Sequence, residues 1–322
     1  MKKNILITGG LGFIGCHCVE KWEKEGYDIT IIDNLSSNAL SPTNELFNNC
    51  KIITDDILNV DIKTLSRFDI ILHLASPVGP VGVLKHSGKI ASIILDDVYW
   101  AINAAKHNQC MLVFVSTSEI YGHRDEKSYL SENDQKVLVG NFTVRNEYSI
   151  SKLLAEIVLS NTAKMDKNFK YQIIRPFNVS GKYQMPDGGF VLPRFVNQAI
   201  KKEDITVYYG GTQLRAFTWV KDIVDGIYLT STCSPEYYNN EWNIGNERNE
   251  TTIMYLAEKC KQYVNSESKI SHVDPVKLHG HLFSEAPEKI PNSGKIRKLL
   301  GWKPNKSVDD VILEVISYYT QK

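Results

Sequence analysis

The octapeptide Thr-Gly-Gly-Leu-Gly-Phe-Ile-Gly at residues 8–15 constrains the fold of this chain more than any other stretch. It lies between a short apolar run and an amphipathic stretch with helical periodicity. Its glycines fit both the G-x-G-x-x-G and the G-x-x-G-x-x-G spacing: Gly9, Gly10, Gly12 and Gly15. Glycine permits positive φ and lets backbone N–H groups approach a pyrophosphate, which a helix N-terminus also attracts. The turn therefore predicts a strand–turn–helix unit that binds a dinucleotide.

An acidic residue at the end of the next apolar run identifies the dinucleotide. Asp33 follows Gly15 by 18 residues. A carboxylate there accepts hydrogen bonds from ribose hydroxyls and repels a 2′-phosphate. No Arg or Lys occurs in residues 34–38. We therefore expect NAD rather than NADP as the cofactor.

Apolar runs alternate with helical stretches over the first 176 residues. The runs predict strands at residues 4–8, 28–32, 51–54, 70–74, 111–116 and 171–175. Strands that alternate with helices form parallel sheets, and near-continuous apolar strands have both faces covered. The pattern predicts an α/β fold of the Rossmann type, a doubly wound parallel sheet with a smaller C-terminal substrate-binding region.

The regular alternation of apolar runs and helical stretches ends after Pro176. A loop rich in Gly and Pro at residues 181–189 precedes a predicted helix at 192–201 and a short strand at 206–209. We expect residues 1–176 to form the NAD-binding domain and residues 177–322 to form mainly the substrate-binding region.

Composition excludes several classes of partner. Lys plus Arg and Asp plus Glu both number 37, so no net charge favours nucleic acid or an anionic membrane. No apolar stretch reaches the roughly 18 to 20 residues of a membrane span, and no signal peptide is expected.

Six cysteines in a chain of this length fit a reducing cytoplasm. Cys16 and Cys18 have the wrong spacing for zinc, so no metal site is expected, and His73 is expected to be a core histidine.

Tyr148 and Lys152 lie four residues apart and share a helix face. A neighbouring ammonium and a positively charged nicotinamide would lower the pKa of the phenol, so that the phenolate removes a proton from a substrate hydroxyl while hydride leaves. Thr117, Ser118 and Glu119 follow a predicted strand at the edge of the sheet where ligands bind. These residues predict an oxidoreductase, with Glu119 as an acid/base or as a group that orients water.

Several motifs together make the chain resemble the extended short-chain dehydrogenase/reductases that modify nucleotide sugars. They are ITGGLGFIG, IIDNLSS, HLAS, VSTSEIYG, RNEYSISKLLAE, RPFNVSG, ITVYYGGTQLRAFTWVKDIVDGI and KIRKLLGWKP. Within the family, Ser-Thr-Ser-Glu-x-Tyr-Gly and Arg145 are most similar to the motifs of UDP-glucuronate decarboxylases. The resemblance extends from Lys3 to about Lys303.

The resemblance implies roles for individual residues. The catalytic set comprises Thr117, Ser118, Glu119, Tyr148 and Lys152. The cofactor set comprises Gly9, Gly12, Phe13, Ile14, Gly15, Asp33, Asn34, Ser36, Asp56, Ile57, Leu74, Ala75, Ser76, Tyr148 and Lys152. The substrate set comprises Thr117, Asn178, Val191, Arg194, Tyr208, Arg215 and Lys289. In it, Thr117 would bind a sugar hydroxyl and Asn178 and Arg215 the diphosphate. The resemblance also implies a homodimer.

Departures from the family pattern bear on the reaction. Ser118 replaces the aspartate of the dehydratases, so dehydration is not expected. Lys289 stands where the decarboxylases carry the arginine of Arg-x-Pro-Asp, and a lysine binds an anion as a point charge without a fork. Ile94 and Asp97 align with an Asn and a Gly of the usual pattern, and the loop at residues 77–88 is unusual.

These observations predict NAD-dependent oxidation of the C4 hydroxyl of a nucleotide-diphospho-sugar, in the synthesis of cell-surface glycan precursors. The enzyme would be a net 4-dehydrogenase or would catalyse the first half of a 4-epimerisation. An oxidative decarboxylase of the UDP-glucuronate type ranks below these because of Lys289. A non-catalytic NAD sensor or scaffold is the remaining alternative, and the base and the sugar stay open.

Overall fold

The computed structural model of the chain describes residues 2–122, 129–138, 142–280, 282 and 288–321. Its centre is a sheet of seven strands in which every neighbouring pair is parallel. From one edge to the other the order is β12 (Asn240–Ile244), β7 (Lys170–Pro176), β5 (Met111–Val115), β4 (Ile70–His73), β1 (Asn4–Thr8), β2 (Asp28–Asp33) and β3 (Cys50–Thr54). This arrangement confirms the predicted Rossmann-type doubly wound sheet, and all six predicted strands are present.

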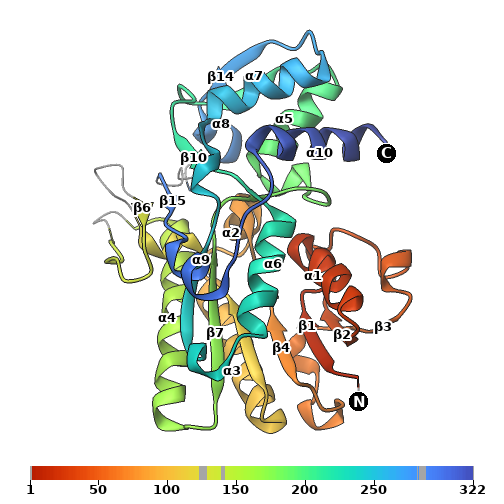
Figure 1. Cartoon of the computed structure of the whole chain (residues 1–322). Helices are drawn as coiled ribbons and strands as arrows, with labels where there is room; N and C mark the ends of the chain where they lie inside the picture. Colours follow the sequence, from red (N-terminus) through yellow and green to blue (C-terminus); the bar gives the residue numbers. More distant parts are fainter. Residues whose placement is uncertain (1, 123–128, 139–141, 281, 283–287, 322) are drawn as a thin grey trace.

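Helices cover both faces of this sheet (Figure 1). One face carries α1 (Phe13–Lys24), α6 (Val220–Ser231) and α9 (Gly294–Leu300), and the other carries α3 (Ile90–Asn108) and α4 (Val144–Met165). Alternate residues of β1 supply the two cores: Ile5 and Ile7 pack toward α1, and Leu6 packs toward α3. The strands are therefore apolar on both faces, as their continuous apolar runs predict.

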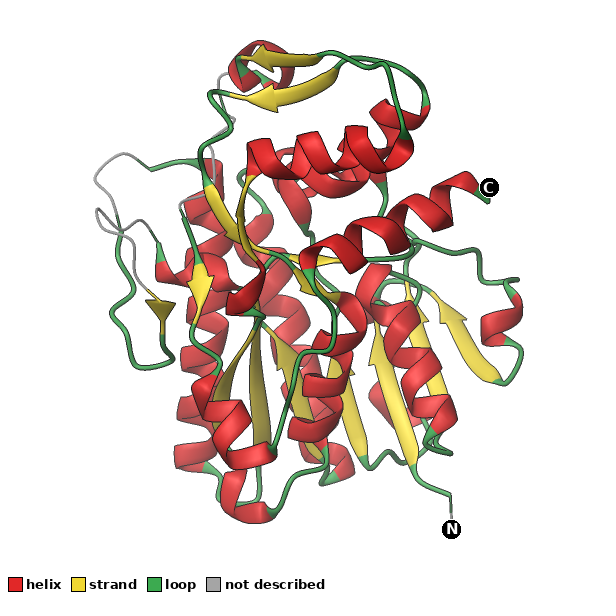
Figure 2. Ribbon diagram, turned by 45° about the horizontal axis from the view of Figure 1, so that its top comes forward, coloured by secondary structure: helices red, strands yellow, loops and turns green. Residues whose placement is uncertain are grey.

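A second group of helices packs beyond the carboxyl edge of the sheet, at the top of Figure 2. It has a core of its own, built from α5 (Val191–Ile200), α7 (Ile253–Val264), α10 (Val308–Thr320) and the parallel pair β9 (Ile205–Tyr208) and β14 (Ile270–Val273). Residues after 176 also supply β12, α6 and α9 to the sheet layers. The C-terminal half of the chain thus contributes to both parts of the molecule.

Short elements connect these two parts. Three further two-stranded pairs are β10 (Leu214–Ala216) with β13 (Glu250–Thr252), β11 (Thr218–Trp219) with β8 (Val179–Ser180), and β15 (Ile290–Pro291) with β6 (Tyr129–Leu130). The remaining α-helices are α2 (Gly79–Lys85) and α8 (Pro275–His279). The 3-10 helices are η1 (Glu45–Phe47), η2 (Ile57–Asn59), η3 (Ile62–Thr64), η4 (Ser118–Tyr121), η5 (Pro186–Gly188), η6 (Pro235–Tyr237) and η7 (Glu247–Asn249).

The segment expected as an unusual loop at residues 77–88 is in part the helix α2. Gly79 has φ +76° and Pro80 occupies the first turn, where a missing N–H costs nothing. In the described part of the chain, no helix is long and apolar enough to cross a bilayer.

Candidate active site

The glycine turn is closed tightly against the loop that follows β4. Gly9 has φ +70°, and its N–H donates to the carbonyl of Ile32 at 2.8 Å. A Cβ on Gly15 would lie 2.2 Å from the carbonyl oxygen of Gly9, and one on Gly9 would lie 2.9 Å from the N of Ala75. Larger side chains would therefore displace backbone. The turn also places Leu74 and Ala75 beside Gly9, shortly before α1, and a helix N-terminus is a favourable position for a pyrophosphate.

The carboxylate of Asp33 is held in place by two backbone groups. Its Oδ2 accepts from the N–H of Leu11 at 3.0 Å and its Oδ1 from the N–H of Leu35 at 2.9 Å. Burial raises the pKa of Asp33, and these two hydrogen bonds oppose the rise. A carboxylate offers about four lone-pair sites, so acceptors remain for two ribose hydroxyls.

A second acid joins this edge of the sheet. Asp56 caps η2 through a bond from the N–H of Leu58 at 3.0 Å, and its other oxygen accepts from Asn34 at 3.2 Å. The N–H of Ser36 in turn donates to the side chain of Asn34 at 3.1 Å. Phe13, Ile14, Ile57 and Ser76 also follow the carboxyl ends of parallel strands, which meet at this edge. The residues present thus fit a dinucleotide with two ribose hydroxyls at Asp33.

Lys152 reaches from α4 to the end of β5. Its buried Nζ donates to the carbonyl of Val115 at 3.0 Å and lies 4.7 Å from the ring centroid of Phe114. Burial lowers the pKa of Lys152 to about 8, and the negative charges of Asp97 and Glu156 oppose the decrease. The spacing of α4 therefore places an ammonium directly before Ser116–Thr117.

Tyr148 is buried on the same face of α4. Burial raises its pKa most, and the negative charge of Glu119 adds to this effect, while a hydrogen bond with Thr117 and the charge of Arg145 oppose it. The sequence predicted that Lys152 would lower this pKa. In the protein alone the desolvation of the phenol dominates.

Glu119 is clamped between two cations. Its Oε2 lies 2.9 Å from Nη1 of Arg145, and its Oε1 accepts a hydrogen bond from Nζ of Lys289. Burial raises the pKa of Glu119, but the two positive charges lower it further, to about 2. Glu119 is thus an ionised carboxylate at neutral pH. Of the two roles predicted for it, orientation of water is favoured over proton donation while both pairs are formed.

The substrate-side residues are joined through β10. Arg215 forms a parallel backbone bridge with Lys289, and the N–H of Leu214 donates to Oε1 of Glu288 at 3.0 Å. Asn178 has φ +38°, and its carbonyl accepts from the N–H of Thr218 at 3.0 Å. The chain therefore brings Arg215 and Lys289 together, and Lys289 contacts Glu119.

Three further predicted residues lie on the second part of the molecule. The guanidinium of Arg194 lies 4.0 Å from the ring centroid of Tyr208, and its Nη2 donates to the carbonyl of Thr206 at 3.1 Å. Val191 begins the same helix, α5. The structure thus brings Arg194 and Tyr208 together.

A buried polar network near Lys152 was not predicted. Glu156 accepts from Ser116 Oγ at 2.5 Å and from Arg175 Nη2 at 2.6 Å, and Arg175 also donates to the hydroxyl of Tyr121 at 3.0 Å. The available signal was the spacing, because Glu156 continues the face of Tyr148 and Lys152 one turn further. The network fixes the end of β5 relative to α4.

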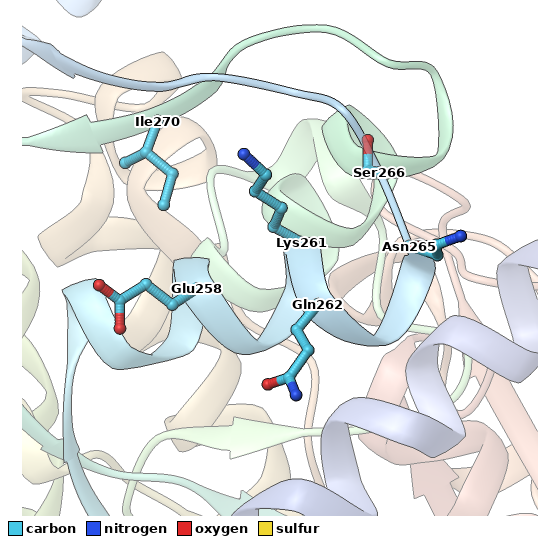
Figure 3. A pocket seen from close by; sticks show the side chains of 6 residues that line it. All are labelled: Glu258, Lys261, Gln262, Asn265, Ser266 and Ile270. Atoms are coloured by element: carbon cyan, nitrogen blue, oxygen red, sulfur yellow. The ribbon is translucent and has the colours of Figure 1, made fainter.

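The hollow over α7 in Figure 3 is a different place. Its lining residues are Glu258, Lys261, Gln262, Asn265, Ser266 and Ile270. None of the predicted site residues is among them.

A parallel sheet with this glycine turn, Asp33 after β2, and Tyr148 and Lys152 beside β5 defines a Rossmann-fold oxidoreductase that uses a nicotinamide dinucleotide. The family model of the NAD dependent epimerase/dehydratase family matches residues 5–245. The chain belongs to that family and is an NAD-dependent enzyme of the extended short-chain dehydrogenase/reductase type.

Known relatives cover the whole chain. It is 32% identical to the UDP-N-acetyl-alpha-D-glucosaminuronate decarboxylase of Bacillus cytotoxicus, over 100% of this chain and 99% of that one. It is 28% identical to UDP-glucuronic acid decarboxylase 1 of Danio rerio, over 100% and 73%. Among solved structures, UDP-N-acetylglucosamine 4-epimerase from Methanobrevibacter ruminantium has a TM-score of 0.85 at 25% identity, covering 100% and 99%. UDP-glucose 4-epimerase from Thermotoga maritima has a TM-score of 0.86 at 24% identity, covering 99% of both chains.

Proposed function

We propose that the chain is an oxidative decarboxylase of a UDP-linked hexuronic acid, which makes a UDP-pentose for glycan synthesis. The observation that carries this proposal is the position of Lys289. This residue contacts the carboxylate of Glu119, whose negative charge also raises the pKa of Tyr148. In a hexuronate, one carbon, C5, separates the C4 hydroxyl from the C6 carboxylate. The site therefore needs a base beside the C4 hydroxyl and a cation beside the C6 carboxylate, and these two groups must lie close together.

Lys289 is suited to bind the substrate carboxylate and then to act as a proton donor. An ammonium has three N–H donors, and Glu119 takes one of them. The side chain is 3% exposed, and burial lowers the pKa of Lys289. A lysine with a lowered pKa is a stronger acid near neutral pH than an exposed lysine.

NAD, when bound along the glycine turn, supplies the hydride acceptor for the alcohol and the hydride donor for the ketone. Tyr148 removes the proton of the C4 hydroxyl, and oxidation gives a ketone that is β to the C6 carboxylate. The C5–C6 bond then breaks, its electron pair passes toward the ketone oxygen, and carbon dioxide leaves. Lys289 donates a proton to C5. The ketone is reduced again as Tyr148 returns its proton, so a hexuronate and one proton give a pentose and carbon dioxide.

The relatives support decarboxylation over release or epimerisation of the 4-ketone. Both curated relatives named above are decarboxylases of UDP-linked uronic acids, and one of them acts on an N-acetylated sugar. The sequence alone ranked release or epimerisation of the 4-ketone higher, because Lys289 lacks the fork of an arginine. Protonation of C5 needs only one N–H donor. A lysine in place of the arginine at position 289 is therefore compatible with decarboxylation.

The second candidate is 4-epimerisation of a UDP-linked sugar. It is favoured by the likeness to a UDP-N-acetylglucosamine 4-epimerase at 25% identity. Epimerisation uses the same oxidation by Tyr148 but needs no proton donor at C5.

A panel of sugar nucleotides separates these reactions. The purified protein would be incubated with UDP-glucuronate, UDP-N-acetylglucosaminuronate and the corresponding neutral UDP-sugars, and the products analysed by mass spectrometry and NMR. We expect loss of one carbon dioxide from at least one uronate. Turnover of only the neutral sugars, or a product of unchanged mass, would contradict decarboxylation.

We also propose that the chain forms a homodimer through α3 and α4, which pack side by side. Tyr99 on α3 and Leu154 and Ile157 on α4 are all more than 40% exposed. Two helices from each of two subunits would cover these apolar side chains. Light scattering at micromolar concentration should give the mass of a dimer, and a monomer mass would contradict the proposal.

A further inference from the structure

Glu147 is an acidic residue of the catalytic helix that the reaction above does not use. It lies in the first turn of α4, directly before Tyr148. Its Oε2 accepts from the N–H of Gly88 at 2.7 Å, and its Oε1 accepts from the N–H of Ile90 at 3.0 Å and of Ala91 at 3.4 Å. One carboxylate thus binds three backbone donors of a segment that lies 56 to 59 residues earlier in the chain.

Two of these donors belong to the start of α3. Ile90 and Ala91 begin this helix, and the first N–H groups of a helix have no partner within it. Lys89, at the N-cap, contributes no side-chain hydrogen bond, and the described first turn of α3 holds no acidic residue. A helix start attracts negative charge. Glu147 therefore supplies from α4 the cap that α3 lacks.

The third donor, Gly88, is not needed for that cap. It precedes the N-cap of α3 and has φ +79°, a conformation that favours glycine. The bond from its N–H ties the segment that follows α2 directly to α4. Because α4 carries Tyr148 and Lys152, this bond fixes the segment relative to the catalytic pair.

The helix α2 has few other contacts to hold it. It has seven residues, all described, none of them is buried, and its N-cap, Val78, forms no side-chain hydrogen bond. A helix of this length is not stable alone in water. At its N-terminal end, a Cβ on Gly79 would lie 2.8 Å from Cζ of Phe190. A Cβ on Gly189 would lie 3.1 Å from Cβ of Pro80. The loop at η5 and the carboxylate of α4 therefore hold α2 from its two ends.

The place of α2 in the fold connects it to the site. The segment follows Ser76 at the carboxyl edge of the sheet, and Phe190 directly precedes Val191 at the start of α5. The helix contacts both α4 and η5, so it lies between the sheet and the second group of helices (Figure 1). Ligands of open α/β sheets bind at this edge. The helix α2 is thus in a position to border the site of the sugar nucleotide.

We propose that Glu147 is a positioning residue for the substrate, which holds α2 in place as one wall of the sugar-nucleotide site. This inference rests on the UDP-sugar substrate of the proposed function, but not on whether that sugar is decarboxylated or epimerised. If α2 is loose, binding must first order it, and the apparent affinity decreases with the fraction of ordered molecules. The chemical step in the bound complex is unaffected. The role also explains why the unusual segment at residues 77–88 is ordered against the catalytic helix.

The order of α2 can be measured without any sugar. Glu147→Gln keeps the length of the side chain, but an amide has one acceptor oxygen where the carboxylate uses two, so the bond to Gly88 or those to α3 must be lost. In the NAD-bound protein, we expect hydrogen–deuterium exchange at residues 80–91 to be at least about tenfold faster in this variant, because a bond to a charged group is lost. Asp310→Asn is the matched control, since the carboxylate of Asp310 caps α10, which has no contact with α2 in this account. It should leave exchange at residues 80–91 unchanged.

Substrate binding gives two further readouts. UDP-glucuronate or UDP-N-acetylglucosamine, added to the natural protein, should slow exchange at residues 80–91 at least about threefold, because the bound sugar covers this wall. Glu147→Gln should raise the KM for the UDP-sugar that is turned over at least about threefold and leave kcat within about twofold. A residue that only stabilises the fold would lower the stability without this separation of KM from kcat.

Unchanged exchange at residues 80–91 in Glu147→Gln would overturn the proposal, as would an equal acceleration in Asp310→Asn. A decrease in kcat at an unchanged KM would also overturn it, and so would a bound UDP-sugar that slows exchange elsewhere in the chain but not at residues 80–91. If Glu147→Gln does not fold, Glu147→Asp, whose shorter carboxylate cannot span Gly88 and α3 together, serves the same tests with the same expected changes. None of these measurements depends on release of carbon dioxide. Failure of the decarboxylase proposal therefore cannot be mistaken for failure of this one.

Discussion

At the scale of single residues, the sequence predicted those groups whose partners are close in the chain. Tyr148 and Lys152 share a face because they are four residues apart, and the contact of Lys152 with Val115 O agrees with that placement. The pairing of Glu119 with Lys289 spans 170 residues and could not be derived from spacing. The same holds for the burial of Asp97, which depends on how α3 packs against α4 and η2.

Tyr148→Phe removes the hydroxyl that accepts the substrate proton. Loss of a general base lowers rates by about 100-fold to 10,000-fold. We expect the transient formation of NADH, followed at 340 nm in the first turnover with an excess of uronate substrate, to slow by that amount while NAD binding is retained. A variant that forms NADH at the natural rate would show that Tyr148 is not the base.

Lys289→Met separates oxidation at C4 from protonation at C5. The variant keeps an unbranched side chain of similar length but has no proton to donate. We expect carbon dioxide release over repeated turnovers to fall at least about 100-fold, because the enolate left after loss of carbon dioxide is no longer protonated at C5, whereas oxidation at C4 continues and NADH accumulates. Lys298→Met, at an exposed lysine of the same segment, is the matched control and should behave like the natural protein. Equal carbon dioxide release from both variants would remove Lys289 from the mechanism.

The burial of Asp97 makes stability depend on pH. An aspartate in the unfolded chain titrates near about pH 4, and the buried Asp97 titrates near pH 7. The folded state therefore holds an extra proton between these values, and its stability decreases as the pH rises through them. Asp97→Asn lacks this decrease, so its free energy of unfolding should exceed that of the natural protein by about 2–4 kcal/mol near pH 8 and by less near pH 5. Urea unfolding at the two pH values measures the difference, and a constant difference would contradict the assigned titration.

At the scale of elements, continuous apolar runs predicted six strands of the sheet correctly. The seventh, β12, reads Asn-Glu-Trp-Asn-Ile and lies at the edge of the sheet, where Trp242 and Ile244 are buried and Asn240 and Glu241 remain partly exposed. A mixed pattern of this kind does not distinguish a strand from a loop. The helix α2 was missed for a related reason, because two prolines and two glycines among residues 77–82 favour a loop when helix propensity alone is considered.

The glycine turn gives a test at this scale. Gly15→Ala would place a Cβ 2.2 Å from the carbonyl oxygen of Gly9, which is backbone and cannot move alone. We expect NAD affinity to fall at least about tenfold, measured by calorimetry, because the turn that holds the pyrophosphate must shift. Gly82→Ala is the control, since a Cβ there meets nothing within 4 Å. Similar NAD affinity in both variants would contradict the role of the turn.

At the scale of the whole molecule, the site exists because distant segments meet at one edge of the sheet. β10 carries Arg215 and bridges to Lys289, and β15 continues from Lys289 to pair with β6, which follows Glu119 in the chain. Residues from both halves of the sequence, Arg145 and Lys289, therefore meet at Glu119. Sequence motifs indicated the members of this site, but only the fold shows that Glu119 is held by two cations.

The most direct test of the account is to run the reaction in deuterium oxide with a UDP-hexuronate labelled with ¹³C at C6. The account predicts release of labelled carbon dioxide, one deuteron at C5 of the pentose product, and no net accumulation of NADH. A product that retains the labelled carboxylate, with inverted configuration at C4 or with NADH formed in equal amount, would contradict decarboxylation and favour epimerisation or release of the ketone.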